Sequence, residues 1–447
     1  MASQFSLFKT RRFSSMFATQ FLGAFNDNVF KQALILVLTY TAAAKMGVAV
    51  SLLNNLAALL FILPYFLFSA LAGQIADKYE KSQLTQKLKL LEIIIMTLAA
   101  VGFVFELYPL LFVALFLMGT HSTFFGPVKY AYLPEVMHKD ELVGANGLFQ
   151  TGTSLAILTG MILAGVLTQL NNSLVWISGI TLLIAILGFI ASRFIPVVPP
   201  HEPNLNVDYN IFRTSFNIIK YLYGLPLLFF IILGNSWFWF YGATFLTQTP
   251  EFSKVILHGN ESVVILLLTL FSVGTAIGSL LCKTLTKNQI SLKLLPIGII
   301  GLSVFAVDLY LSLSGIRINA PAHGTYTISE LLNMNGTIRV FADLFLLGLS
   351  GGIYIVPLYA FMQAYAPISH RSRIVGANNI FNAIFMVGSA IFSIIILTVL
   401  TLSIPQLFLI TGVINAVFGI FLYIKLTRYK DSMAMAEDDG LWRSQYE

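Results

Sequence analysis

Long apolar runs separated by short polar segments make up almost the whole chain. Each run is about twenty residues long, which is the length that a helix needs to cross the hydrocarbon core of a bilayer. The pattern therefore predicts an all-α polytopic membrane protein with twelve transmembrane helices. The predicted spans are residues 13–44, 51–74, 84–107, 109–133, 141–169, 174–195, 222–247, 261–284, 291–313, 337–365, 374–401 and 405–427.

Two polar segments interrupt this pattern. Residues 196–210 contain four prolines and three asparagines, which favour an extended linker at the midpoint of the chain. Residues 314–336 form the second polar segment, which we expect to be an external loop. We therefore predict an N-terminal six-helix bundle, a cytoplasmic linker, a C-terminal six-helix bundle and a cytoplasmic tail, at residues 1–195, 196–220, 221–430 and 431–447.

Composition and charge agree with a membrane protein. The chain is 57% hydrophobic with a mean hydropathy of +0.82, and 10% of its residues are charged, against about 25% in soluble domains. The net charge is +6, but the basic residues are spread over many loops and form no stripe for nucleic acid. Most of the 26 lysines and arginines lie on one side of the predicted spans, so the positive-inside rule places both termini in the cytoplasm. The exceptions are Lys45, Lys254, Arg317 and Arg339 in opposite loops, and Lys31 and Lys129 within spans.

A polar cluster lies inside the first predicted span. Asp27 is about 15 residues past Arg12, or roughly 22 Å along a helix, which puts it near the bilayer midplane. Charges at that depth cost roughly 2.5–3.5 kcal/mol each unless they face a partner or a watery cavity. Asp27 and Lys31 are four residues apart, so we expect them to neutralise each other on one helix face. We interpret Asn26, Asp27, Asn28 and Lys31 as a site for a charged headgroup or a coupling cation, with a structural clasp between helices as the alternative.

Further polar residues lie within the fourth and fifth predicted spans. Lys129 follows Gly126-Pro127, a pair that predicts a kink. Its ammonium is either a phosphate-binding cation or a group that snorkels to the headgroup layer. His121 is nearer the midplane, where a hydrogen-bonded structural role is favoured over a proton relay. Asn146 is a weaker site candidate, because hydrogen bonds between helices also account for amides at membrane depth.

Three features of the second half have structural interpretations. Asp343 follows Arg339 by four residues, so we expect these two to pair and Asp308 to reach water at a helix end. Residues 348–352 have the letters of Gly-x-Ser-x-Gly but not the strand–turn–helix context of a hydrolase, so we expect close packing or a helix break. The aromatic segment 237–241 is either an interfacial belt or a wall for an acyl chain.

The chain carries no familiar catalytic or cofactor motif. It lacks the phosphate-cradling Gly-x-x-x-x-Gly-Lys-Ser/Thr loop, the His-Glu-x-x-His metal motif and any Cys/His spacing typical of zinc sites. None of its six histidines is followed five residues later by aspartate, the spacing that glycerolipid acyltransferases carry. We therefore expect no cofactor, no metal, no direct nucleotide drive and no enzyme activity.

The two halves of the chain resemble each other. Residues 143–149 (VGANGLF) match residues 375–381 (VGANNIF), and Gly73 and Lys78 have counterparts at the equivalent place in the second half. Two six-helix halves of the same orientation form the repeat pattern of major facilitator transporters. The repeat therefore predicts the major facilitator fold.

Several segments resemble the bacterial lysophospholipid transporter branch of this superfamily. Residues 73–78 (GQIADK) resemble the general loop signature, and the more specific segments are 20–28 (QFLGAFNDN), 127–130 (PVKY) and 144–148 (GANGL). The resemblance implies a secondary transporter that moves lysophospholipids, such as lysophosphatidylethanolamine, across the bacterial inner membrane by alternating access. It implies a substrate site drawn from Asn26, Asp27, Asn28, Lys31, Lys129 and Asn146.

The resemblance also implies a cytoplasmic latch. In the superfamily the aspartate of the loop signature caps a neighbouring helix. Asp77 holds that position here, and we expect it to dock at the start of the eleventh helix, near Ser369, Arg371 and Arg373. Asp77 and Arg373 are therefore the gating candidates.

Two other functions stay open. In a proton-coupled exporter of amphipathic drugs, Asp27 would be the protonated site. A membrane enzyme or enzyme subunit of lipid metabolism is the rival from another class, and an acyltransfer assay separates it from a transporter. For a lysophospholipid transporter the expected partners are the lysolipid, membrane lipids and a separate acyltransferase, with no nucleic acid.

Overall fold

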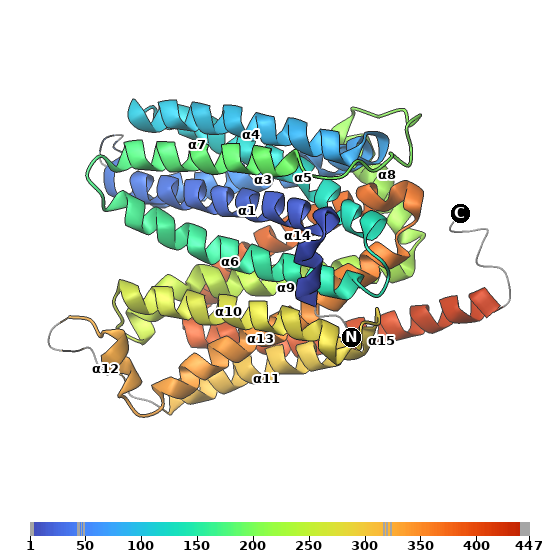
Figure 1. Ribbon diagram of the computed structural model, residues 1–447. Helices are drawn as coiled ribbons and strands as arrows, with labels where there is room; N and C mark the ends of the chain where they lie inside the picture. Colours follow the sequence, from blue (N-terminus) through green and yellow to red (C-terminus); the bar gives the residue numbers. More distant parts are fainter. Residues whose placement is uncertain are drawn as a thin grey trace. The chain divides into compact units, whose positions relative to one another are not determined.

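The computed structural model describes residues 4–42, 45, 47, 50–315, 318, 321 and 324–438, which fold almost entirely into helices (Figure 1). Eleven helices are long and apolar enough to cross a membrane, and α4 is a twelfth long helix among the described residues. The predicted all-α architecture is therefore confirmed. The long helices are α1 (Arg11–Val37), α3 (Val50–Lys78), α4 (Lys81–Val104), α5 (Tyr108–Val136), α6 (Leu142–Thr168), α7 (Ser173–Ser192), α9 (Pro226–Glu251), α10 (Glu261–Leu285), α11 (Leu295–Ser314), α13 (Thr337–Tyr365), α14 (Arg371–Ile394) and α15 (Ile404–Asp438).

α4 differs from the other long helices because its charges are spaced so that no stretch of span length has as few as two of them. Its 24 residues include Lys87, Lys89 and Glu92. The helix nevertheless packs against α5 and α7, and Lys89 and Glu92 are buried. These two charges therefore serve contacts inside the protein and do not mark a helix end.

Short helical segments connect the long ones, and some depart from the sequence predictions. Helix α8 occupies part of the predicted linker, because Asn210 caps it by accepting a hydrogen bond from the Arg213 backbone N–H at 3.0 Å. A capping box of Thr327 and Glu330 starts α12 inside the predicted external loop. The predicted polar tail begins as the last part of α15, whereas residues 43–44, Arg317 and 439–447 lie outside the described residues. The short segments are η1 (Gln4–Lys9), η2 (Leu38–Ala42), α8 (Ile211–Tyr223), η3 (Phe252–Ile256), η4 (Leu292–Leu294), α12 (Ile328–Leu332), η5 (Ile368–His370) and η6 (Ile395–Val399).

The helices form two compact units. The first contains Met1–His138, Leu155–Gly224 and Ala366–Ala383, and the second contains Lys139–Ser154, Leu225–Tyr365 and Ile384–Glu447. Two long helices therefore contribute to both units: α6 begins in the second and ends in the first, and α14 does the reverse. This division decides which of the candidate site residues belong to the same unit.

The core of the first unit lies between α1, α4, α5 and α7. Phe30 and Phe103 meet edge to face with ring centroids 5.9 Å apart, and Met96 and Leu115 are buried beside them. In a membrane such packing acts through van der Waals contact, because lipid tails are as apolar as the side chains. The apolar contacts hold α1 beside α4 and α5, so the polar residues of these three helices face one another.

The second unit contains a seam of glycines between α10 and α13. A Cβ atom added at Gly274, Gly278, Gly348 or Gly352 would lie only 2.0–2.3 Å from a backbone oxygen of the facing helix. Only glycine permits this approach, as at other close helix crossings in membranes. Ser350 donates a hydrogen bond to a carbonyl of its own helix at 2.7 Å. The Gly-x-Ser-x-Gly sequence at residues 348–352 therefore forms part of the packing surface between α10 and α13.

Candidate functional site

A buried polar cluster joins α1, α4 and α5 in the first unit. The Asn26 side-chain amide donates to Glu92 Oε1 at 2.7 Å. Lys89 Nζ lies 2.7 Å from Glu92 Oε2, and His121 Nε2 lies 3.5 Å from the same oxygen. All four side chains are buried. A buried charge pair is tolerated only where further hydrogen bonds offset the loss of water, and Asn26 supplies one of them.

A glycine on α1 makes room for this cluster. A Cβ atom at Gly23 would lie 2.5 Å from Lys89 Nζ, so the ammonium reaches the surface of α1 only because position 23 has no side chain. On its other side the ammonium lies 4.9 Å from the centroid of the Phe125 ring, a cation–π contact. The sequence interpretation missed Lys89 and Glu92. Their signal is visible in hindsight, since Lys87, Lys89 and Glu92 fall inside the predicted span 84–107.

Asp27 and Lys31 do not form the expected pair. Asp27 Oδ2 accepts a hydrogen bond from Ser122 on α5 at 2.6 Å, and Lys31 Nζ lies 5.0 Å from the centroid of the Phe61 ring. Among the described residues no ion pair joins the two. The predicted direct ion pair is therefore not formed, because neighbouring helices supply each side chain with another partner, although the two opposite charges still attract each other. The second carboxylate oxygen of Asp27, Oδ1, is buried without a hydrogen-bond partner among the described residues.

Asn28 forms a hydrogen bond within its own helix, whereas Lys129 lies beside a polar side chain of another helix. The Asn28 amide donates to the Ala24 carbonyl of its own helix at 2.8 Å. Lys129 Nζ lies 3.4 Å from the Gln20 side-chain oxygen and 5.1 Å from the centroid of the Tyr130 ring. No carboxylate forms an ion pair with Lys129 in the part of the chain that the structure describes. Its polar contact among these residues is therefore with a neutral amide on α1.

Asn146 belongs to the second unit, unlike the other five substrate-site candidates. Its amide donates to Gln363 Oε1 at 2.7 Å, and the Gln363 amide donates back to Asn146 Oδ1 at 3.0 Å. A further bond joins Asn146 to the carbonyl of Leu142 on its own helix at 3.0 Å. This reciprocal amide pair between α6 and α13 is the helix–helix hydrogen bond that the sequence left as the alternative.

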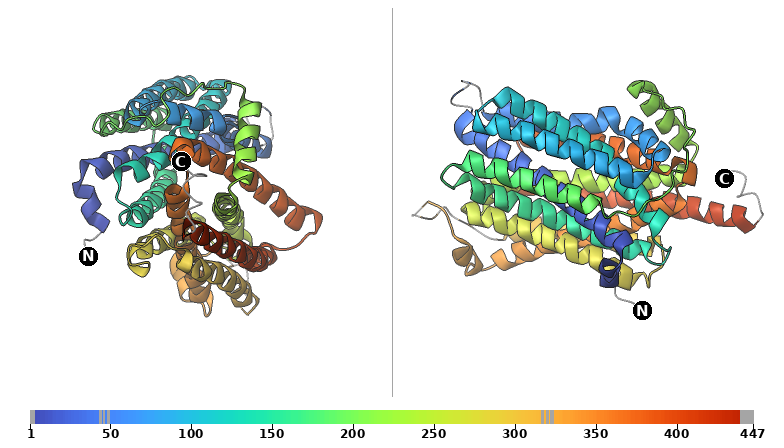
Figure 2. Two further views of the ribbon diagram at one scale, coloured as in Figure 1. Left: turned by 90° about the vertical axis from the view of Figure 1, so that its right-hand side faces the viewer. Right: turned by 45° about the horizontal axis from the view of Figure 1, so that its top comes forward.

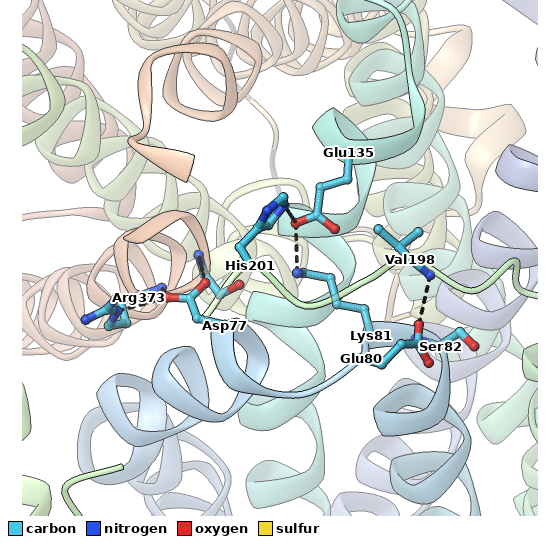
Figure 3. A network of polar contacts seen from close by, with 9 residues as sticks. Asp77, Glu80, Lys81, Ser82, Glu135, Val198, His201 and Arg373 are labelled. Carbon is cyan, nitrogen blue, oxygen red and sulfur yellow. Dashed lines mark hydrogen bonds and ion pairs between the residues drawn. The ribbon is translucent and has the colours of Figure 1, made fainter. Parts of the chain in front are cut away.

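The end of α3 meets the start of α14 within the first unit. Asp77 Oδ1 accepts the Ser372 backbone N–H at 2.9 Å, while Oδ2 accepts Arg373 Nε at 2.9 Å and the Arg373 backbone N–H at 3.3 Å (Figure 3). The carboxylate is buried, and it satisfies amide groups that the first turn of a helix leaves open. The contact expected for Asp77 is thus present.

Two glycines bring these helix ends together. A Cβ atom at Gly73 would lie 2.6 Å from the Cα atom of Arg373, and one at Gly376 would lie 2.3 Å from the Ser69 carbonyl oxygen. The two backbones therefore touch directly. The glycine of the loop signature is needed because a side chain there would push Asp77 away from the N-terminus of α14.

The linker is fastened to the same end of the unit. Glu135 on α5 lies 2.7 Å from Lys81 Nζ and 3.1 Å from His201 Nε2 (Figure 3). Glu80 caps α4 and also accepts the Val198 backbone N–H at 3.1 Å. Two further linker amides bond to the end of α3: Glu202 to the Asp77 carbonyl at 3.2 Å and Asp208 to the Gln74 side chain at 2.9 Å. The linker therefore packs over the residues around Asp77 and is held there by hydrogen bonds and an ion pair.

The charged pair and the aromatic segment predicted for the second unit can also be compared with the structure. Arg339 forms its ion pair with Asp308 on the neighbouring helix α11. Asp343 instead accepts a hydrogen bond from Ser312 at 3.0 Å. The predicted Arg339–Asp343 pair is therefore wrong, because Asp308 on the neighbouring helix binds the guanidinium of Arg339.

In the aromatic segment, residues 237–241, the Trp237 Nε1–H donates to a buried asparagine of α15 at 2.8 Å. Neither role predicted for that segment is decided by this packing.

Comparison with known proteins agrees with this architecture. The family model described as Major Facilitator Superfamily matches residues 16–384. The chain belongs to this superfamily. It is therefore a multi-pass membrane protein of a transporter family, which the long apolar helices also require.

Individual relatives and solved structures show which members of the superfamily the chain is similar to. The chain is 27% identical over 365 residues to the lysophospholipid transporter LplT of Enterobacter sp. (strain 638), which covers 81% of each chain. It is 26% identical over 382 residues to LplT of Cronobacter sakazakii, covering 84% of each. Among solved structures, the human organic anion transporter MFSD10 gives a TM-score of 0.72 at 12% identity, covering 92% of this chain and 99% of that one. The Escherichia coli fucose:proton symporter FucP gives 0.68 at 14% identity, covering 92% and 98%. At these identities the structures support the fold alone.

Proposed function

We propose that this member of the superfamily is a secondary transporter of lysophospholipids. The observation that carries the proposal is the similarity to lysophospholipid transporters over four fifths of the chain. The specific segments lie at the polar residues of α1, α5 and α6, which is where a substrate site would differ between transporters of one fold. Transport proceeds by alternating access, in which two sets of helices rock about a site near the bilayer midplane.

The surroundings of Lys129 and Asp27 suit a zwitterionic headgroup. Lys129 has no carboxylate partner among the described residues, and its ammonium binds the lysolipid phosphate by charge-assisted hydrogen bonds. Asp27 has one oxygen without a hydrogen-bond partner there, and this oxygen takes the ammonium of an ethanolamine headgroup. Lys31 favours an anionic or zwitterionic ligand over a cationic one. The remaining site candidates, Asn26, Asn28 and Asn146, orient the helices through their own hydrogen bonds.

Asp77 and Arg373 form the latch of the transport cycle. Their contact holds the end of α3 against the start of α14 in one state, and it breaks in the other. A carboxylate at a helix N-terminus contributes roughly 0.3–1 kcal/mol, and up to about 2 kcal/mol when partly buried. A contact of that size biases a balanced equilibrium without locking it.

The same proposal places the protein in its membrane. It lies in the bacterial inner membrane with both termini in the cytoplasm, as the distribution of lysine and arginine supports. The lysolipid moved to the inner leaflet is reacylated by a separate acyltransferase. The protein itself performs no covalent chemistry, uses no cofactor and binds no nucleic acid.

Uptake of labelled lysophosphatidylethanolamine tests the proposal. Purified protein in liposomes, and spheroplasts with and without the protein, should take up the lysolipid. Lys129→Ala should reduce uptake at least tenfold, while Lys129→Arg should keep a larger share, because arginine keeps the charge. Lys87→Ala changes an exposed lysine of α4 and serves as the matched control.

Other outcomes would select other functions. Movement of cationic dyes without lysolipid would select the proton-coupled drug exporter. Acyltransfer by the purified protein would select the enzyme. Normal lysolipid uptake by Lys129→Ala would refute the headgroup assignment.

A further inference from the structure

Helix α8 is the one segment of the linker that folds into a helix of several turns. It has 13 residues, or about 20 Å at 1.5 Å per residue. Figure 2 shows it running across the end of α3, in the first unit to which both belong. A helix that lies across the ends of membrane spans lies along the membrane surface.

One face of α8 packs against the rest of the first unit. Thr214, Ile218 and Leu222 follow one another at intervals of four residues, and all three are buried. Beside them the Tyr221 ring stacks on His370, with centroids 4.4 Å apart. This face therefore fixes the rotation of α8 about its axis.

The opposite face exposes large aromatic side chains. Phe212 is 70% exposed, Phe216 is 66% exposed and Tyr223 is 65% exposed. At 3.6 residues per turn these three positions form one stripe, about half a turn away from Thr214 and Ile218. Exposed rings arranged in a row mark an interaction site, and burying a phenylalanine side chain is strongly favourable.

A basic edge runs beside the aromatic stripe. Arg213 and Lys220 are seven residues apart, so they project from the same side of α8, with the exposed Asn217 between them. The Arg213 side chain is 66% exposed, and its guanidinium lies 3.8 Å from Asp208 Oδ2, a loose ion pair that leaves other guanidinium N–H groups open to solvent. An apolar stripe bordered by basic residues is the arrangement of helices that lie in a membrane interface.

We propose that α8 is an interfacial helix that binds anionic lipid. Its aromatic stripe enters the boundary between headgroups and acyl chains, and Arg213 and Lys220 bind headgroup phosphates. Two features favour lipid over a partner protein. The basic charges complement anionic headgroups, and only Gly224 and Leu225 separate the end of α8 at Tyr223 from the start of the span α9 at Pro226, so the chain enters the membrane directly after α8. The proposal rests on membership of a membrane transporter family and not on the substrate.

Spin labels at neighbouring positions test the placement. Cys282 is the single cysteine and is buried, so Cys282→Ser provides a background for Phe216→Cys or Asn217→Cys carrying a nitroxide. In liposomes of phosphatidylethanolamine and phosphatidylglycerol, the label at 216 should collide more often with oxygen than with a water-soluble nickel chelate. The label at 217 should show the reverse. Equal accessibility of both labels to the chelate would overturn the proposal, as would shielding of the 216 label from both reagents, which indicates a protein partner.

The second arm tests the anionic lipid. Raising the phosphatidylglycerol fraction should increase oxygen accessibility at 216, and the odds of insertion should fall about fivefold for each of Arg213→Gln and Lys220→Gln. Lys287→Gln alters an exposed lysine far along the chain and should leave the response unchanged. If oxygen accessibility at 216 does not change with the phosphatidylglycerol fraction when Arg213 and Lys220 are both present, the basic residues do not contribute to lipid binding.

Discussion

At the scale of single residues, the buried polar side chains combine contacts within one helix with contacts to a neighbouring helix. Glu92 is held by Lys89 on its own helix and by Asn26 on α1. Asp27 binds Ser122 on α5 instead of the lysine four positions along its own helix. Each of these groups is expensive in hydrocarbon alone, so the cluster depends on every member being present.

Removing one charge of the Lys89–Glu92 pair should destabilise the fold. Lys89→Ala leaves a buried carboxylate without its cation, which costs about 3–5 kcal/mol. Lys89→Met combined with Glu92→Leu removes both charges and should recover most of that loss. Lys87→Ala, on the exposed side of α4, is expected to stay within about 0.5 kcal/mol. Thermal unfolding in detergent ranks the variants, and equal losses for Lys87→Ala and Lys89→Ala would contradict this role.

Asp27→Asn should stop lysolipid uptake while the protein stays folded. The asparagine keeps an oxygen that accepts the Ser122 hydroxyl, and a neutral side chain costs less in the bilayer. It cannot pair with the headgroup ammonium, however. Uptake is measured in liposomes and normalised to monodisperse protein. Thr97→Ala, an exposed change on α4, should keep uptake; full uptake by Asp27→Asn would show that this carboxylate is dispensable.

At the scale of elements, glycines decide how closely helices approach. The α3–α14 contact requires Gly73 and Gly376, and the α10–α13 contact requires a glycine row on both helices. These contacts are made by backbone atoms, so even a methyl group alters them. The polar latch at Asp77 depends on this geometry, because its hydrogen bonds span only the distance that the glycines allow.

Two glycines of α14 offer a matched pair of substitutions. At Gly376 a Cβ atom would lie 2.3 Å from the Ser69 carbonyl oxygen, whereas at Gly388 nothing lies within 4 Å. Gly376→Ala should therefore push α3 and α14 apart and cost about 1–3 kcal/mol. Gly388→Ala should be neutral, or stabilising by up to about 1 kcal/mol through helix propensity. Thermal midpoints compare the two, and a Gly376→Ala variant as stable as Gly388→Ala would argue against backbone contact at this crossing.

At the scale of the whole molecule, transport requires that contacts such as Asp77–Ser372 form and break. The contact is made by one buried carboxylate and the first turn of α14. Contacts worth 1–2 kcal/mol shift a two-state population by roughly five- to thirtyfold. That range suits a latch, since a much stronger contact would trap one state.

Asp77→Ala should shift the population toward the state in which α3 and α14 separate. Ser69→Cys in the Cys282→Ser background reports this, because Ser69 is fully buried beneath Gly376. Labelling of the new cysteine by a water-soluble maleimide should rise about fivefold or more in Asp77→Ala. Lys78→Ala, the neighbouring change, should leave the labelling rate as it was. An unchanged rate in Asp77→Ala would remove Asp77 from the gate.

The sequence by itself determined the class of fold. Apolar runs of span length must become helices, because hydrocarbon offers backbone groups no other hydrogen-bond partners. The repeat and the loop signature then pointed to one superfamily, which the family comparison confirmed. The position of Asp77 at the start of α14 also followed from that signature, since a helix N-terminus attracts a carboxylate.

Only the tertiary structure decided which polar groups meet. Spacing along one helix suggested Asp27–Lys31 and Arg339–Asp343, whereas packing paired Asp27 with Ser122 and Arg339 with Asp308. Spacing of four residues makes a contact available, but a neighbouring helix can offer a better one, and no single-helix pattern encodes that choice. For the same reason the amide pair of Asn146 with Gln363, and the contact of Asn26 with Glu92, appeared only when the helices were packed together. Such contacts depend on how side chains from distant segments fit, and that is a property of the folded chain.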